Sequence, residues 1–242
     1  MSTLTGKVAL VTGGSRGIGR AVARALLERG ASVAITARTD ATLSKADKEL
    51  QPSVKGGALL GVRADVRKPD DVERAMKDTI ARFGGLDILV NNAGVGVFRT
   101  VADMSIDEWH QIIDTNLSGV FYCTRAALPH LRARGGGWVI NISSLAGKNS
   151  FPEAAAYCAS KAGLNAFSEA LMQEVRHDGI RVSYVMPGSV KTGFGGHAAT
   201  GSEDWKLTPE DIAEVVTDLI AHPARSLPSR VEIRPARPPK KG

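Results

Sequence analysis

The chain has 242 residues, of which 43% are hydrophobic and 23% are charged, and its formal net charge is +6 at pH 7. This composition is typical of globular proteins, and no apolar run approaches the roughly 18 residues that a membrane helix needs, so we expect neither a disordered chain nor a membrane partner. Four of the six excess positive charges lie in the last nine residues, RPARPPKKG, and a short basic Pro-rich tail is usually just solvated, so we expect no nucleic acid partner.

The N-terminal stretch MSTLTGKVAL has no apolar signal-peptide core, and a cytoplasmic protein is therefore expected. From there, short apolar runs alternate with longer helical patterns to the end of the chain. The seven predicted strands are Val8–Thr12, Ser32–Thr36, Leu59–Arg63, Ile88–Asn91, Trp138–Ser143, Arg181–Met186 and Arg230–Ile233. The six predicted helices are 17–29, 40–50, 69–83, 106–133, 154–176 and 208–221.

Parallel strands need crossover connections, and helices of this length supply them. The order of elements therefore predicts an α/β fold, a doubly wound (Rossmann-type) seven-stranded parallel sheet with helices on both faces. A single domain over residues 1–242 is expected at this length.

The first predicted strand runs into a glycine-rich turn, TGGSRGIG, at Thr12–Gly19. Glycines there let backbone N–H groups approach a pyrophosphate closely, and the N-terminus of the following helix stabilises its negative charge. An ordinary turn is the alternative, because the spacing departs from the G-x-G-x-x-G fingerprint.

The predicted helix 154–176 contains YCASK, which places Tyr157 and Lys161 on one face, roughly 5–6 Å apart. An ammonium beside a phenol lowers its pKa from about 10 towards the range useful for proton transfer. A buried tyrosine and a surface lysine are the alternative. The same helix carries a ridge of methyl groups that suits a tight internal crossing or a subunit contact, formed by Ala155, Ala159, Ala162, Ala166 and Ala170.

The order and spacing of several motifs resemble those of the short-chain dehydrogenase/reductase family. They are T-G-x-x-x-G-x-G at Thr12–Gly19, Asp65-Val66, Asn91-Asn92-Ala93-Gly94, Asn116, Ser144, Tyr157 with Lys161, and Pro187-Gly188 followed by Val190 and Thr192. The resemblance implies reversible hydride transfer between a nicotinamide cofactor and a carbonyl or alcohol substrate. It gives Tyr157 the role of general acid and base, with Ser144 polarising the carbonyl. Lys161 would bind the nicotinamide ribose, and Asn116 would hold a water that links Lys161 to solvent.

NADP(H) is the expected cofactor, because Arg16 and Arg38 can bind a 2′-phosphate where a carboxylate would repel it. Asp40, as the N-cap of the next helix, could instead reach a free ribose and favour NAD(H). The predicted cofactor-binding residues are Gly13, Ser15, Arg16, Gly17, Ile18, Gly19, Arg38, Thr39, Asp65, Val66, Asn92, Ala93, Gly94, Tyr157, Lys161, Pro187, Gly188, Val190 and Thr192.

The substrate stays open. Gly94, Val95, Leu145, Phe151, Met186 and Phe194 could line its pocket or simply pack. Lys148 could favour an anionic substrate or be solvated. The Gly-rich segment 193–207 suggests a flexible lid, and residues 234–242 form the basic tail.

No metal site is expected, because the five histidines lack ligand spacing, and Cys123 and Cys158 are expected to be buried free thiols. The resemblance and the alanine ridge imply a homotetramer or a dimer. Alternatives are a non-catalytic NADP(H)-binding sensor or scaffold, a nucleic-acid-binding protein that uses the tail, and a related epimerase or dehydratase.

Overall fold

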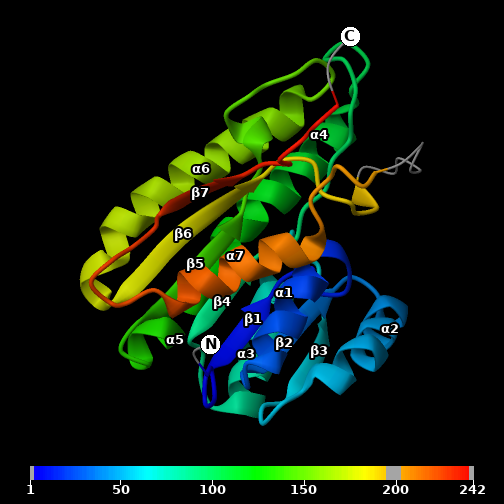
Figure 1. Cartoon of the computed structure of the whole chain (residues 1–242). Helices are drawn as coiled ribbons and strands as arrows, with labels where there is room; N and C mark the ends of the chain where they lie inside the picture. Colours follow the sequence, from blue (N-terminus) through cyan, green and yellow to red (C-terminus); the bar gives the residue numbers. More distant parts are fainter. Residues whose placement is uncertain (1–2, 195–202, 240–242) are drawn as a thin grey trace.

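The computed structural model describes residues 3–194 and 203–239 and contains a seven-stranded sheet of order β3-β2-β1-β4-β5-β6-β7 (Figure 1). Every neighbouring pair of strands is parallel. The strands are β1 (Val8–Val11), β2 (Ser32–Ala37), β3 (Leu59–Arg63), β4 (Ile88–Asn91), β5 (Gly137–Ile142), β6 (Ile180–Pro187) and β7 (Arg230–Ile233). The predicted fold class is confirmed.

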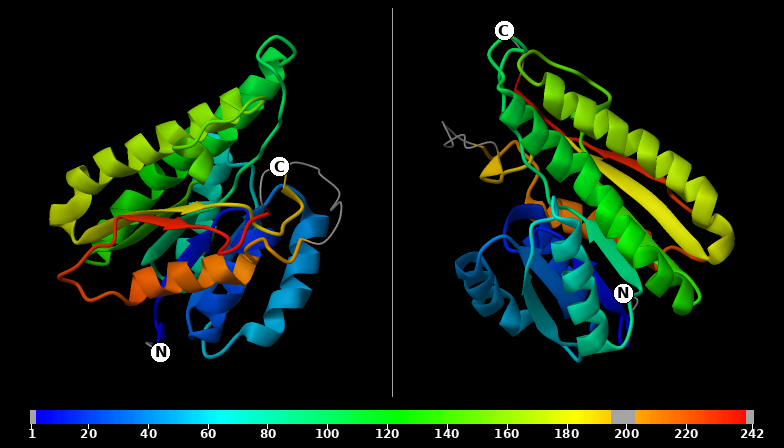
Figure 2. Two further views of the ribbon diagram at one scale, coloured as in Figure 1. Left: turned by 45° about the horizontal axis from the view of Figure 1, so that its top comes forward. Right: turned by 180° about the vertical axis from the view of Figure 1, so that it is seen from behind.

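Helices cover both faces of the sheet. They are α1 (Gly17–Glu28), α2 (Asp40–Leu50), α3 (Pro69–Phe83), α4 (Ile106–Ile113), α5 (Gly119–Ala133), α6 (Ala155–Val175) and α7 (Pro209–Ala221). The first two and α7 pack on one face, and Figure 2 shows α3, α5 and α6 on the other. Capping boxes fix the starts of α4 (Ser105 with Glu108) and α7 (Thr208 with Asp211), where side chains bond the free N–H groups of the first turn.

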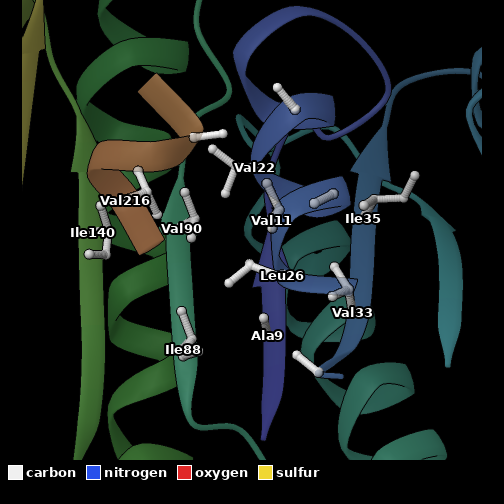
Figure 3. Close-up of a cluster of buried hydrophobic side chains, with 14 of the residues drawn as sticks. Ala9, Val11, Val22, Leu26, Val33, Ile35, Ile88, Val90, Ile140 and Val216 are labelled. Carbon is white, nitrogen blue, oxygen red and sulfur yellow. The ribbon is translucent and has the colours of Figure 1, made fainter. Parts of the chain in front are cut away.

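The core consists of two apolar layers, one on each side of the sheet. Alternate residues of β1 supply both layers, because successive side chains of a strand point to opposite faces. Ala9 and Val11 face α1, whereas Val8 and Leu10 belong to the layer under α3, α5 and α6. Figure 3 shows the first layer, in which Val22 and Leu26 of α1 and Val216 of α7 lie over the strands. This packing holds the carboxyl ends of the strands along one edge of the sheet.

The prediction of a single helix over 106–133 is only partly right. A π-helical turn, Asp114–Ser118, separates α4 from α5. Gly119 follows this turn and lies close to Val66, where an added Cβ would come within 2.9 Å of the Val66 Cγ2 atom. The π turn inserts an extra residue into the helix, and such turns are frequent at functional sites. Thr115 and Asn116 lie in it, and both are buried.

Other predicted features have mixed outcomes. Cys123 and Cys158 are buried free thiols, as predicted. Much of the predicted lid, residues 195–202, and the end of the basic tail, residues 240–242, lie outside the described residues. None of the helices between residues 3–194 and 203–239 has the length and apolar character needed to cross a membrane.

Candidate active site

The turn after β1 and the turn after β4 are hydrogen-bonded to each other. Thr12 Oγ1 accepts the N–H groups of Asn92 and Ala93, both at 3.0 Å, and Asn92 Nδ2 donates to the Thr12 carbonyl at 2.9 Å. Gly13 has φ +63°, and an added Cβ there would lie 2.9 Å from the Ala93 Cα atom. A Cβ on Gly19 would collide with Asn92 and lie 2.5 Å from the Gly13 carbonyl oxygen. These glycines therefore let the turns after β1 and β4 pack closely and form a cradle, and any larger residue at either position would push the two turns apart.

The N-terminus of α1 faces this cradle. Its N-cap, Arg16, makes no side-chain capping bond, and the first turn contains no acidic residue. The free N–H groups and the positive end of the helix dipole suit a phosphate group.

A cleft of about 810 Å³ opens above the carboxyl ends of the strands and begins at this cradle. It brings together nineteen of the predicted site residues, including Ser144, Tyr157 and Lys161. Gly19 and Asn116 do not line it. Gly19 is buried under Asn92, and Asn116 lies behind the turn at Gly94, where an added Cβ would be 3.4 Å from Asn116 Oδ1.

Three cations lie at the end of the cleft near α2: Arg16, Arg38 and Lys45. Within the described ranges, none of them forms an ion pair with a carboxylate, whereas nearby Arg20 pairs with Glu49. Sequence reasoning missed Lys45. Thr39, Thr42 and Lys45 are spaced three residues apart at the start of α2, and this helical period could have identified it.

The alternative role of Asp40 is not supported. The N-cap of α2 is Thr39, which accepts a hydrogen bond from the Thr42 N–H at 3.3 Å. Asp40 does not line the cleft, and its carboxylate accepts from Arg63 at 3.2 Å. Asp65, which does line the cleft, is held by the Nε of Arg67 at 3.0 and 3.1 Å. The Arg67 hydrogen bonds outweigh burial and keep the pKa of Asp65 below its usual value. This carboxylate therefore stays ionised, and the Arg67 guanidinium balances its charge.

Tyr157 and Lys161 lie one helical turn apart near the start of α6, on the same buried face. The tyrosine is 9% exposed and the lysine 4%. The Lys161 ammonium donates to the Ile142 carbonyl at 2.8 Å and lies 6.0 Å from the centre of the Tyr157 ring. Ser144 follows β5 and hydrogen-bonds Tyr157, so the three side chains form one group at the carboxyl end of β5.

Burial decides how this group titrates in the chain alone. It raises the pKa of Tyr157, and the hydrogen bond from Ser144 opposes this effect only in part. Burial also lowers the pKa of Lys161 to about 8. In the chain alone, desolvation therefore raises the pKa of Tyr157, and the prediction that the ammonium and an oxidised nicotinamide ring together lower it stays a prediction.

Asn116 holds the loop that follows β4. Its Oδ1 accepts the Val95 N–H at 2.8 Å, and its Nδ2 donates to the Val95 carbonyl at 2.9 Å and to Ser160 Oγ at 3.1 Å. The π turn aims the buried side chain at this loop. The water-holding role implied by the resemblance stays a prediction.

The site fits a phosphorylated dinucleotide. Gly13 and Gly17 of the cradle line the cleft, and the first turn of α1 has N–H groups that can bind a phosphate. Arg16, Arg38 and Lys45 also line it, and none of them forms an ion pair within the described part of the chain. A buried phenol that shares a hydrogen bond with a serine hydroxyl can donate a proton to a bound oxygen atom.

Comparison with known proteins agrees with this geometry. A family model described as "short chain dehydrogenase" matches residues 7–202. An uncharacterized oxidoreductase of Staphylococcus aureus (strain N315) is 36% identical over 236 residues, which cover 97% of this chain and all of that protein. An uncharacterized oxidoreductase of Staphylococcus saprophyticus is 32% identical over 235 residues, which cover 97% of this chain and all of that protein.

Two solved structures are similar over nearly the whole chain. One is an alcohol dehydrogenase from the archaeon Thermococcus sibiricus complexed with 5-hydroxy-NADP, with a TM-score of 0.88, 33% identity, and 97% of this chain and 99% of that chain covered. The other is a metagenomic short-chain oxidoreductase in complex with NADP, with a TM-score of 0.85, 39% identity, and 98% and 100% covered.

Proposed function

The chain belongs to the short-chain dehydrogenase family, and from this premise we propose that it is an NADP(H)-dependent oxidoreductase that interconverts a carbonyl compound and its alcohol. Tyr157 is the general acid and base of this proposal. One observation carries it: a buried Tyr157 hydrogen-bonded by Ser144, with Lys161 one turn away, faces a glycine-cradled cleft.

The residues that would hold the cofactor divide into two groups. Gly13, Gly17 and the first turn of α1 suit its pyrophosphate, and Arg16, Arg38 and Lys45 suit a 2′-phosphate. NADP is also the ligand named for the metagenomic relative. When bound, NADPH supplies the hydride that reduces the carbonyl carbon.

Tyr157 transfers the proton. Because burial raises its pKa, the phenol keeps its proton at neutral pH and can give it to the oxygen of a carbonyl group as negative charge develops there. Ser144 hydrogen-bonds the same oxygen and orients it. In the oxidative direction the phenolate takes the proton from the alcohol.

Lys161 supports this step electrostatically. Its ammonium uses one donor on the Ile142 carbonyl, and its remaining N–H groups can serve a cofactor hydroxyl in the cleft. With a pKa of about 8, Lys161 can also accept and release a proton near neutral pH.

Substitution of Tyr157 by Phe tests the proposal. The variant removes the hydroxyl and keeps the ring that packs on Phe98, so the fold and the cofactor site stay intact. NADPH oxidation, followed optically against ketones, aldehydes, quinones and β-ketoacyl thioesters, should fall by about 10³-fold. NADPH affinity, measured by calorimetry, should change little. Full activity in this variant would remove Tyr157 from the proton-donor role, and NADPH binding without consumption in the wild-type protein would favour a sensor or scaffold.

We also propose that the chain forms a homo-oligomer, a tetramer or a dimer, in the cytoplasm. All five alanines of the predicted ridge are exposed on α6, which favours a contact with a second subunit over an internal crossing. The mass in solution, measured by light scattering, tests this part.

A further inference from the structure

Two phenylalanines from separate loops flank the Tyr157 ring, and a third, from another loop, packs on one of them. Phe98 follows β4, Phe151 precedes α6, and Phe194 follows β6. The ring centres of Phe98 and Tyr157 are 5.8 Å apart at an edge-to-face angle of 68°, and those of Tyr157 and Phe194 are 5.6 Å apart. Phe151 continues the group, with its ring centre 6.1 Å from that of Phe98. Only 5% of the chain is aromatic, and half of its six phenylalanines lie at this one place.

The local backbone holds these rings in place. The Arg99 N–H donates to the Glu153 carbonyl at 2.8 Å, which ties the loop of Phe98 to the loop of Phe151. Glu153 has φ +64°, a conformation that a non-glycine residue adopts only when its surroundings impose it. Gly96 has no side chain, and an added Cβ would lie 2.6 Å from Phe194 Cε1 and 3.2 Å from Phe98 Cζ. The close approach of the two rings therefore depends on this glycine.

Cations near these loops are already neutralised. Lys148 donates to Glu232 at 2.7 Å, and Arg99 lies 3.8 Å from a carboxylate oxygen of Glu108. Hydrogen bonds from Lys148 and Arg234 lower the pKa of Glu232 to about 2, so that its charge persists at any ordinary pH. The hypothesis that Lys148 attracts an anionic substrate is therefore not supported. Glu153 on the Phe151 loop is exposed and would repel an anion.

The rings remain partly exposed although they pack against one another. Phe151 is 48% exposed and Phe194 36%, whereas Phe83 and Phe167 pack against the core. Exposed aromatic rings beside a proton-transfer group favour an apolar ligand that covers them.

We propose that this aromatic cluster, formed by Phe98, Phe151 and Phe194, binds the substrate and selects an uncharged carbonyl compound that carries an aromatic or alicyclic ring. The inference rests on the proposed oxidoreductase function and adds its substrate class. The ring of the substrate lies against the phenylalanines, and its carbonyl oxygen points at the Tyr157 hydroxyl.

Three ring-bearing ketones separate the effect of charge from that of aromaticity: acetophenone, cyclohexyl methyl ketone and 4-acetylbenzoate. Initial rates of NADPH oxidation give kcat/KM for each. Acetophenone and cyclohexyl methyl ketone should exceed 4-acetylbenzoate, which differs from acetophenone by one carboxylate, by about 10-fold or more. Phe151→Ala should raise KM for acetophenone about 10-fold and change its kcat little.

Phe121→Ala is the matched control. Phe121 lies on α5, is 46% exposed, and packs on Tyr122 rather than near Tyr157. Its substitution should leave KM for acetophenone unchanged. The elution volume of both variants in size-exclusion chromatography should match that of the wild type. A Phe151→Ala variant that altered elution but not KM would make Phe151 an interface residue and overturn the proposal. Equal or better use of 4-acetylbenzoate would overturn it as well.

A binding measurement keeps the two proposals distinguishable. Calorimetric titration of 1-phenylethanol into the protein with NADPH, a pair that cannot react because both partners are reduced, should show binding that Phe151→Ala weakens. If no ketone consumed NADPH while this binding persisted, the oxidoreductase proposal would fall and the substrate class would stand. If NADPH were consumed but ring-bearing ligands bound no better than 2-butanol, the substrate class would fall alone.

Discussion

Replacing Lys161 by Met should stabilise the cofactor-free protein at pH 7 and remove a specific pH dependence. Lys161 is 4% exposed, and its ammonium donates a hydrogen bond to the Ile142 carbonyl at 2.8 Å. Burial lowers its pKa from 10.5 to about 8. Methionine has nearly the same length and no charge, so it fills the space without the cost of desolvation.

The magnitude follows from linkage. Between pH 8 and 10.5 the unfolded chain keeps the proton on Lys161 and the folded protein releases it, so the wild-type protein gains stability as the pH rises through this window. The difference between 10.5 and about 8 corresponds to about 3 kcal/mol at about 1.4 kcal/mol per pH unit. The lost hydrogen bond offsets about 1 kcal/mol of this. We therefore expect the variant to be about 2 kcal/mol more stable at pH 7, and most of this advantage should disappear by pH 10.

Urea unfolding of the cofactor-free proteins at pH 7, 8, 9 and 10, followed by tryptophan fluorescence, measures the difference. Burial also raises the pKa of Cys123 to about 12, which weakens both proteins in alkali, so only the comparison at each pH is informative. Lys55→Met, at an exposed position, controls for the loss of one formal charge. A difference between the Lys161 variant and the wild type that stayed constant from pH 7 to pH 10 would refute the reasoning.

Five further variants, one of them a control, test the cleft and the fold. Ala37→Asp combined with Arg38→Leu should weaken NADPH binding by about 100-fold and shift the preference of the protein towards NADH. Lys45→Gln should weaken NADPH binding by about 5-fold, most clearly at low salt. Calorimetry with both cofactors measures these affinities, and equal effects on NADH and NADPH binding would contradict the assignment. Gly19→Ala places a Cβ against Asn92 and the Gly13 carbonyl, so Tm should fall by about 4–8 °C and NADPH binding should be lost. The control Gly61→Ala makes only ordinary van der Waals contacts with Leu43 and should change Tm little. Asp87 accepts hydrogen bonds from Lys7, Val8 and Arg134, which outweigh burial and lower its pKa, so Asp87→Asn should cost about 3 kcal/mol in denaturant unfolding at pH 7. The stability that this carboxylate contributes is lost as the pH falls through its lowered pKa, so a difference that persisted unchanged in strong acid would speak against the assignment.

Sequence periodicity predicted the sheet closely. Each predicted strand ends within one residue of the observed one, because strands buried on both faces read as short apolar runs between turns. The glycine turn and the pairing of Tyr157 with Lys161 were also predictable, since local spacing determines which of their atoms share a face or a turn. The place of Ser144 beside Tyr157 was expected from the family resemblance.

The rest of the site depends on contacts between distant parts of the chain. The π turn at Asp114–Ser118 was not predicted, because an inserted residue leaves the apolar pattern of a helix nearly unchanged. The pairing of Lys148 with Glu232, 84 residues away, was equally hidden. The gathering of Phe98, Phe151 and Phe194 requires three loops to meet, and no local pattern specifies that.

The titration of Tyr157 shows how such contacts change the chemistry. Sequence spacing puts a cation near the phenol, and that alone would lower its pKa. The fold also removes both groups from water, which favours the neutral phenol and the neutral amine over their charged forms. The chain alone therefore keeps the Tyr157 phenol protonated, as the proposed role of proton donor to a carbonyl oxygen requires. Under the proposed function, return of that proton in the oxidative direction requires additional positive charge at the site, which the oxidised cofactor would supply when bound.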